Sequence, residues 1–146
     1  MLTVKTILKK KGNRVYSIKP EQTVYEALIT LAEKEVGALL VMEGENILGI
    51  FSERDYARKL VLKAFFSKEV LVKDVMTQDL IVESPDANIF QCMSLMTEKR
   101  IRHLPIIDED KLIGIISIGD LVNTIIHSQK ETIKTLESYI QGGGYG

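Results

Sequence analysis

Two short segments of the chain carry residues whose types and spacing could bind a ligand. Gly49–Asp55 and Gly114–Asp120 both read glycine, two apolar residues, serine, two variable residues and aspartate. A glycine inside a strand lets another group come close, a helix N-terminus offers N–H groups to phosphate, and a carboxylate accepts hydrogen bonds from ribose hydroxyls. The pattern therefore indicates two places where a group carrying ribose and phosphate could bind.

The same pattern has a purely structural alternative. Ser-x-x-Asp is close to a capping box, in which the serine hydroxyl and the acidic side chain satisfy free N–H groups of the first helical turn. A single copy would favour this alternative. Two copies that repeat the glycine, the serine and the aspartate together favour a ligand site.

The sequence contains an internal repeat, and each copy of the repeat carries one of these segments. A shift of 65 positions places Pro20 on Pro85, Ser52 on Ser117 and Asp55 on Asp120 without a gap. Upstream of this stretch, residues 4–8 match residues 72–76 at a shift of 68, so the first copy carries about three extra residues in a loop near residues 10–13.

Each copy changes its periodicity in the same order, which predicts β-α-β-β-α twice. A short extended piece comes first, followed by a helix with Pro20 or Pro85 in its first turn and Ser84 as a cap in the second copy. Two β-rich runs joined by short polar turns come next, and a second helix begins near Glu53 or Ile118. The predicted strands are residues 15–18, 38–42 and 47–52 in the first copy, and 80–82, 104–107 and 112–117 in the second.

The fold class we expect is mixed α/β (α+β), with the two repeats related by a pseudo-twofold axis and stacked through their sheets. One repeat of about 60 residues is marginal alone, whereas two can bury their sheet faces on each other. The expected divisions are repeat 1 at 1–63, a connector at 64–71 that packs through Phe65 and Phe66, repeat 2 at 72–128, and an appended helix with a Gly-rich tail at 129–146.

Composition narrows the function classes. Nineteen Lys and Arg against twenty Asp and Glu give a net charge of −1, which argues against a nucleic-acid partner. No apolar run approaches the roughly 20 residues of a membrane span, and no signal peptide is recognisable. A single cysteine excludes an internal disulfide and fits a reducing compartment. We therefore expect a cytoplasmic protein without a membrane partner.

The chain lacks the residue groupings of an enzyme or a metal site. It has two histidines and one cysteine, without His-x-x-x-His or Cys-x-x-Cys spacing. We expect Cys92 to lie in the core and His127 to have a surface or packing role on the C-terminal helix. The prediction is a protein with no catalytic residues, no metal and no catalytic cofactor.

Together with Val72–Thr77 and Ile101–Asp108, the two motifs resemble the tandem cystathionine β-synthase (CBS) domain family, over about residues 4–122. The resemblance implies a stand-alone regulatory, energy-sensing module with two pseudo-symmetric sites in a cleft between the repeats. It also implies an adenosyl ligand, with AMP first and ADP, ATP, NAD or S-adenosylmethionine as alternatives.

Carried over to this chain, the resemblance assigns ribose hydroxyls to Asp55 and Asp120, and the phosphate or ribose to Ser52 and Ser117. The remaining contacts would be Val15, Val36, Gly37, Ala38 and Ile50 around one adenine, and Leu80, Ile101, Arg102, His103 and Ile115 around the other.

Arg54, Arg102 and His103 could bring positive charge to phosphates. The alternative is an exposed Arg102 and a half-buried, capping His103. Because Gly37-Ala38 of the first copy is replaced by Arg102-His103 in the second, we expect two sites that are not equivalent.

Two partner hypotheses remain open at this point. The first is a nucleotide-binding module that regulates an unidentified effector protein. The second is a scaffold or partner-regulating protein that binds no nucleotide and uses the motifs only as helix caps. In either case the resemblance implies a homodimer formed through helices, for which spare apolar positions are Tyr56, Leu60, Leu121, Ile125 and Ile126.

Overall fold

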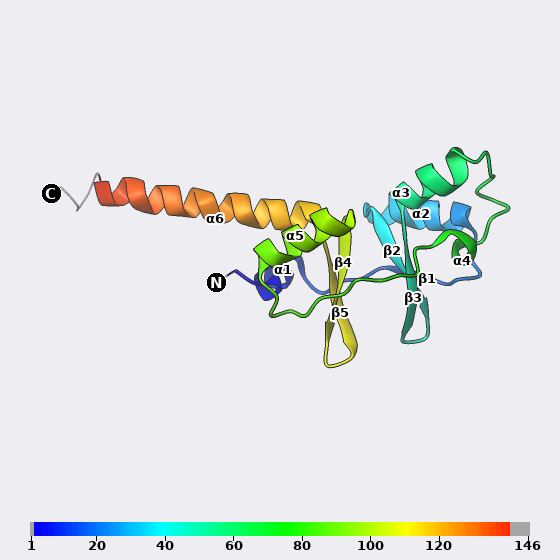
Figure 1. The fold of residues 1–146 in the computed structure, drawn as a ribbon, viewed down its shortest axis with the longest axis horizontal. Coiled ribbons are helices and arrows are strands. Elements are labelled where there is room, and N and C mark those ends of the chain that lie inside the picture. Colours follow the sequence, from blue (N-terminus) through cyan, green and yellow to red (C-terminus); the bar gives the residue numbers. More distant parts are fainter. Residues whose placement is uncertain (1, 141–146) are drawn as a thin grey trace. The chain divides into compact units, whose positions relative to one another are not determined.

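The computed structural model describes residues 2–140, which fall into two compact units. Residues 14–81 form one unit, called the middle unit here. Residues 2–13 and 82–140 form the other, called the terminal unit. Figure 1 labels the helices and strands of both units.

The middle unit is built on a three-stranded sheet in the order β1-β2-β3. Strand β1 runs parallel to β2, and β2 pairs with β3 in an antiparallel hairpin. The core forms where α2 and the later helices cover apolar side chains of this sheet, with Leu39, Phe51 and Leu60 fully buried. Its elements are β1 (Ser17–Ile18), α2 (Val24–Lys34), β2 (Ala38–Glu43), β3 (Asn46–Ser52), α3 (Glu53–Asp55), the π-helix η1 (Tyr56–Val61) and α4 (Val72–Val75).

The terminal unit is built on the antiparallel hairpin of β4 and β5. The extended segment that precedes α5, expected as a strand at residues 80–82, forms only one parallel bridge, between Glu83 and Ile106. Within residues 2–140, no helix combines the length and the apolar character needed to cross a membrane. The elements are α1 (Val4–Lys11), α5 (Ile89–Lys99), β4 (His103–Asp108), β5 (Lys111–Ser117) and α6 (Ile118–Ser138).

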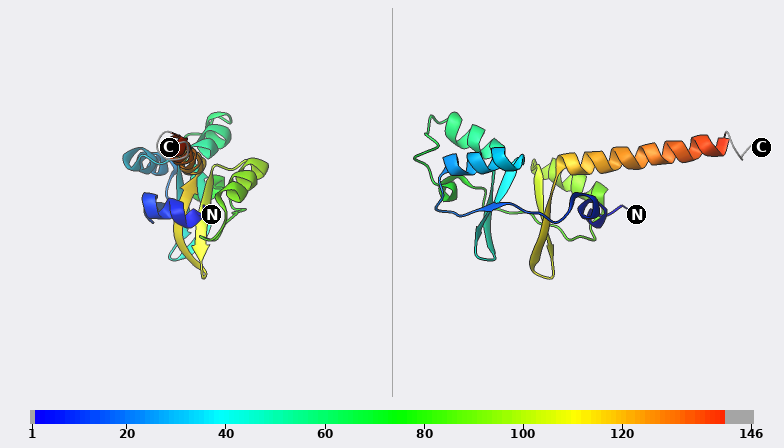
Figure 2. Two further views of the ribbon diagram at one scale, coloured as in Figure 1. Left: turned by 90° about the vertical axis from the view of Figure 1, so that its left-hand side faces the viewer. Right: turned by 180° about the vertical axis from the view of Figure 1, so that it is seen from behind.

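The two units exchange their first helices relative to the order of the sequence. Helix α1, from the first copy, docks in the terminal unit, where the Val4 N–H donates to the carbonyl oxygen of Ala87 at 3.0 Å. Helix α4, from the second copy, docks in the middle unit, where the Val72 N–H donates to Gln22 at 2.8 Å. These are equivalent positions of the repeat, so the same docking occurs twice. Figure 2 shows α1 beside the strands of its unit.

The glycines of the two motifs make room for these docked segments. A Cβ at Gly49 would lie 2.7 Å from the backbone oxygen of Thr77, and a Cβ at Gly114 would lie 2.7 Å from Cδ2 of Leu8. The expectation that a close-approaching ligand explains these glycines is therefore wrong, because the protein itself occupies that space.

The first long helix of each copy starts later than the sequence analysis placed it. Helix α2 begins at Val24 behind a capping box of Thr23 and Glu26, and α5 begins at Ile89 behind Asn88. Pro20 lies in the preceding turn, where its carbonyl oxygen accepts from the Lys73 N–H at 3.0 Å. The prolines and Ser84 thus belong to the turns that receive the exchanged helices.

The connector packs only in part. Val70 lies against the core of the middle unit, and its carbonyl oxygen accepts from the Val24 N–H at 2.9 Å, whereas the two phenylalanines do not pack. Phe65 and Phe66 are 54% and 70% exposed. They follow a turn that ends at Ala64, which has a left-handed φ of 59°.

The expected core position of Cys92 is confirmed, since Cys92 is 1% exposed. Of the two roles expected for His127, the structure shows the surface one, since its side chain is 57% exposed.

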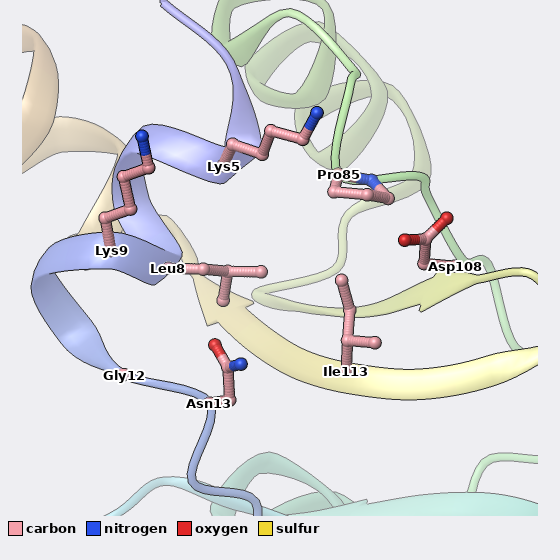
Figure 3. A pocket seen from close by; sticks show the side chains of 8 residues that line it. All are labelled: Lys5, Leu8, Lys9, Gly12, Asn13, Pro85, Asp108 and Ile113. Carbon is pink, nitrogen blue, oxygen red and sulfur yellow. The ribbon is translucent and has the colours of Figure 1, made fainter.

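A hollow of about 470 Å³ lies between α1 and the β4–β5 hairpin in the terminal unit. Its apolar floor includes Leu8 and Ile113, with Lys5 and Lys9 on the helix side and Asp108 on the hairpin side (Figure 3). None of its lining residues is among the site residues expected from the sequence.

Candidate functional site

The residues expected for the first site gather at one end of the middle unit's sheet. Ala38, the first residue of β2, pairs with Ser52, the last residue of β3. The Gly37 carbonyl oxygen accepts from the Glu53 N–H at 3.1 Å, which joins this end to α3. Because β1 is parallel to β2, Val15 precedes β1 at the same end of the sheet.

Three further residues of the first site belong to the same end. Val36 precedes β2, Ile50 lies next to the end of β3, and Arg54 is half-buried in the short helix α3. The middle unit therefore contains every residue that the sequence analysis assigned to the first site.

The terminal unit repeats this arrangement. His103 pairs with Ser117, and the Arg102 carbonyl oxygen accepts from the Ile118 N–H at 2.9 Å. Ile101 and Ile115 flank the same end of the hairpin, whereas Leu80 belongs to the middle unit. The side chain of Arg102 is exposed and that of His103 is half-buried.

Both Ser-x-x-Asp motifs form complete capping boxes. Asp55 accepts from the Ser52 N–H at 2.9 Å, and the Ser52 hydroxyl accepts from the Asp55 N–H at 3.3 Å. The corresponding distances for Ser117 and Asp120 are 2.8 and 3.1 Å. The structural alternative is therefore present in the molecule, and any ligand role of the aspartates has to coexist with capping.

Asp55 has further polar partners and little access to solvent. Its Oδ1 accepts from the Thr77 hydroxyl at 3.1 Å and lies 3.1 Å from Nζ of Lys59. Lys59 is itself held by the Val75 carbonyl oxygen at 2.7 Å. With its side chain 10% exposed, the Asp55 carboxylate is already well satisfied by the protein.

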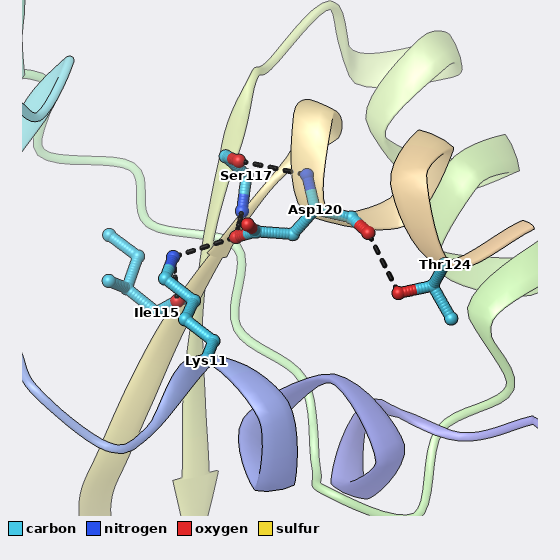
Figure 4. A network of polar contacts seen from close by, with 5 residues as sticks. All are labelled: Lys11, Ile115, Ser117, Asp120 and Thr124. Carbon is cyan, nitrogen blue, oxygen red and sulfur yellow. Dashed lines mark hydrogen bonds and ion pairs between the residues drawn. The ribbon is translucent and has the colours of Figure 1, made fainter. Parts of the chain in front are cut away.

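Asp120 has a different partner and more exposure. Nζ of Lys11 donates to Asp120 Oδ2 at 2.7 Å and to the Ile115 carbonyl oxygen at 2.9 Å (Figure 4). The Ser117 N–H also ends on Oδ2, so both contacts use the same carboxylate oxygen. The side chain of Asp120 is 24% exposed, and that of Lys11 is 34% exposed. A carboxylate and an ammonium group thus lie together at the N-terminus of α6.

The environment of Asp120 favours its charged form. Burial opposes ionisation, but the hydrogen bond from Lys11 and the N–H of Ser117 outweigh it and lower the pKa of Asp120 below its usual value of 3.8. The carboxylate is therefore an ionised acceptor at neutral pH.

His103 is held in its neutral form. Burial lowers the pKa of His103 below its usual value of 6.5, the charges of Lys11 and Arg102 lower it further, and Asp120 opposes them. The positive charge that the sequence analysis considered for this residue is thus disfavoured at neutral pH.

Three partners of the aspartates were missed by reasoning from the sequence. Lys59 lies one helical turn after Asp55, at a spacing that could have indicated the ion pair. Thr77 and Lys11 reach the aspartates only because α4 and α1 are exchanged between units. The repeat alignment contained both segments, but it gave no sign of where they dock.

Comparison with known proteins now identifies the family. The CBS domain family matches residues 3–62 and 72–127. The chain belongs to this family. The resemblance noted in the sequence and the mixed α/β fold class are both confirmed.

Relatives and solved structures of CBS-domain proteins match most of the chain. The mitochondrial CBS domain-containing protein CBSX3 of Arabidopsis thaliana is 37% identical over 150 residues, which cover 97% of this chain and 73% of the relative. A solved protein with CBS domains from Burkholderia ambifaria is 47% identical, with a TM-score of 0.84 and coverage of 88% of this chain and 96% of that one.

An enzyme and a hexameric protein are also among the proteins that match this chain. Inosine-5'-monophosphate dehydrogenase of Methanocaldococcus jannaschii is 34% identical over 110 residues, which are 74% of this chain but only 21% of the enzyme. The hexameric CBS-CP12 protein from bloom-forming cyanobacteria is 27% identical, with a TM-score of 0.74, and the match covers 84% of this chain and 70% of that one.

Proposed function

We propose that this CBS-domain chain is a non-catalytic regulatory module that binds an adenine nucleotide, with AMP as the first ligand to test. The observation that carries the proposal is the pair of Lys11 and Asp120 at the start of α6. An ionised carboxylate accepts hydrogen bonds from ribose hydroxyls, while an ammonium group and the positive end of the helix dipole attract phosphate. Both halves of a nucleotide thus have a partner in the terminal unit.

We propose that the sites at Asp55 and Asp120 bind a nucleotide with different affinities. Within residues 2–140, the hydrogen bonds from Lys11 and from the Ser117 N–H both end on Oδ2 of Asp120, and we propose that Oδ1 is the acceptor for a ribose hydroxyl. Asp55 already uses both oxygens for Ser52, Thr77 and Lys59. A ligand at Asp55 would have to replace hydrogen bonds that the protein makes, so we place the stronger site at Asp120.

A binding function is better supported than catalysis. Cys92 is buried, and burial raises the pKa of its thiol, which disfavours the nucleophilic thiolate. His127 lies on the surface of α6, where its Nε2 is 3.6 Å from Glu131. A buried thiol of this kind also fits our proposal of a reducing compartment, with the cytoplasm first.

The match to a small part of inosine-5'-monophosphate dehydrogenase supports a regulatory assignment, since there the same kind of region accompanies a much longer enzyme. We propose that this chain likewise regulates an effector protein.

A scaffold function without nucleotide is the second candidate. The observation in its favour is that both motifs are complete capping boxes, which need no ligand to explain their serine and aspartate. Exposed apolar side chains around Leu62, Phe65 and Phe66 offer a surface for a partner protein.

One titration experiment separates the two functions. The full chain is titrated calorimetrically with AMP, ADP, ATP, NAD and S-adenosylmethionine, and each ligand is also tested for a rise in the thermal midpoint. Saturable binding of AMP, with a matching rise in the midpoint, supports the nucleotide module. If all five ligands give no heat and no shift, the scaffold function replaces it.

A further inference from the structure

Helix α6 continues far beyond the body of the terminal unit. Every residue from Gln129 to the helix end at Ser138, and the two that follow, are exposed. Figures 1 and 2 show this end of the helix running away from the strands and helices of its own unit. Isolated helices shorter than about 12–15 residues are marginal in water, so the extension calls for a partner.

The extension carries an apolar seam with coiled-coil spacing. Val122, Ile126, Ile133, Leu136 and Ile140 are between 40% and 58% exposed. Their positions, with Gln129 between them, advance alternately by four and three residues, which is the spacing of alternating d and a positions in a heptad repeat. A seam of this period fits another helix with the same period.

We infer that α6 forms a parallel, two-stranded coiled coil with α6 of a second copy of the chain. Ile126, Ile133 and Ile140 occupy the a positions, and the d positions are Val122, Gln129 and Leu136. Isoleucine at a with leucine at d favours two strands, and the three a positions together with Leu136 follow this rule. This inference rests on the seam of α6 and does not rest on the proposed nucleotide binding.

The residues beside the seam are compatible with a second copy in parallel orientation. In a parallel pair, Thr132 faces Glu137 of the other helix and Ile125 faces Lys130, so no like charges meet. An antiparallel pair in the register that uses the whole seam would place Lys130 of one helix opposite Lys130 of the other, so that two positive charges would meet.

The polar residue of the seam agrees with the parallel orientation. Gln129 faces Gln129 of the other copy in a parallel pair, where the two amides can hydrogen-bond to each other. In the antiparallel register it would face Ile133 and lose that partner. Asn or Lys at a single a position fixes register at some cost in stability, and we assign the same role to Gln129 at its d position.

The test measures the mass of the full chain by sedimentation over a range of micromolar concentrations. Ile133→Asp places a charge in the seam, and Thr135→Asp places the same charge outside it on the same exposed turn. We expect Ile133→Asp to weaken self-association at least about tenfold, and Thr135→Asp to leave it unchanged. A parent that stays monomeric, or equal association of the parent and Ile133→Asp, would overturn the inference.

A second variant tests orientation without disturbing the seam's apolar residues. Gln129→Cys should form an intermolecular disulfide under mild oxidation, because a parallel pair brings the two thiols together. Thr135→Cys should not. If the chain associates but the Gln129→Cys variant forms no crosslink, the parallel arrangement is wrong.

Discussion

Lys11 and Asp120 lie 109 residues apart in the sequence and form a hydrogen-bonded ion pair of 2.7 Å. The pair exists because α1 of the first copy docks in the terminal unit, where its last residue reaches the start of α6. Asp120 is thereby an acceptor with a cation beside it. A nucleotide that binds here would meet Asp120 through its ribose and Lys11 through its phosphate.

Replacing Lys11 should separate phosphate recognition from ribose recognition. Lys11→Met removes the ammonium group, so we expect the affinity for AMP to fall about tenfold, in line with the loss of one charge-assisted hydrogen bond. The affinity for adenosine, which lacks phosphate, should not fall, because Asp120 gains free acceptor capacity. Calorimetric titration of both ligands measures the difference.

The matched control for this variant is Lys10→Met, which removes the same charge one residue earlier from an exposed position of α1. It should bind AMP like the parent. Equal losses for AMP and adenosine in Lys11→Met would mean that Lys11 only supports the fold, and equal losses in both variants would point to general charge attraction.

His103 should make the protein less stable as the pH falls below neutrality. Its pKa is lowered in the folded state, so between about pH 7 and 5 the unfolded chain takes up a proton that the folded chain resists. Stability is therefore fully present above the usual pKa of 6.5 and declines below it. Urea unfolding should show a smaller decline for His103→Asn than for the parent.

A parallel decline of parent and His103→Asn over that range would contradict the assignment to His103. Asp120 acts in a separate range, because a lowered carboxyl pKa contributes stability above its usual value of 3.8 that is lost only as the pH falls further. The two effects can thus be distinguished in one pH series.

Local patterns in the sequence were enough to predict the repeat, the hairpins and the helix that follows each hairpin. The turns after Glu43 and Asp108 and the helix starts at Glu53 and Ile118 all follow from periodicity over a few residues. The positions of α1 and α4 could not be predicted in this way. Their docking depends on backbone contacts between distant segments, such as the contact of Val4 with Ala87.

The same limit explains the errors at the site and at the presumed dimer surface. Gly49 and Gly114 were assigned to ligand approach because the segments that cover them are remote in sequence. Leu60 and Leu121 were taken as spare apolar positions for a partner, but both are completely buried in their own units. Periodicity identifies an apolar face without saying which neighbour covers it.

The two motif glycines should respond differently to alanine. The Cβ of Gly49→Ala would meet the Thr77 backbone oxygen, which is fixed by a 2.9 Å hydrogen bond from the Ile50 N–H. We expect this variant to lose about 1–3 kcal/mol of unfolding free energy through overpacking. Gly114→Ala meets the end of the Leu8 side chain, which can rotate, and should lose less. Urea denaturation of both variants measures the order, and a larger loss at Gly114 would contradict the packing described here.

The most direct measurement is calorimetric titration of AMP into the parent and Asp120→Asn. Asparagine keeps an acceptor for the Ser117 N–H but loses the charge, so the unliganded variant should keep most of its stability. We predict AMP binding about 10- to 100-fold weaker, since a charge-assisted hydrogen bond contributes about 1.5–3 kcal/mol. Asp55→Asn should have a smaller effect, and the exposed Asp86→Asn none. If Asp120→Asn bound AMP as tightly as the parent does, Asp120 would be a helix cap only, and the proposed nucleotide site at the start of α6 would be wrong.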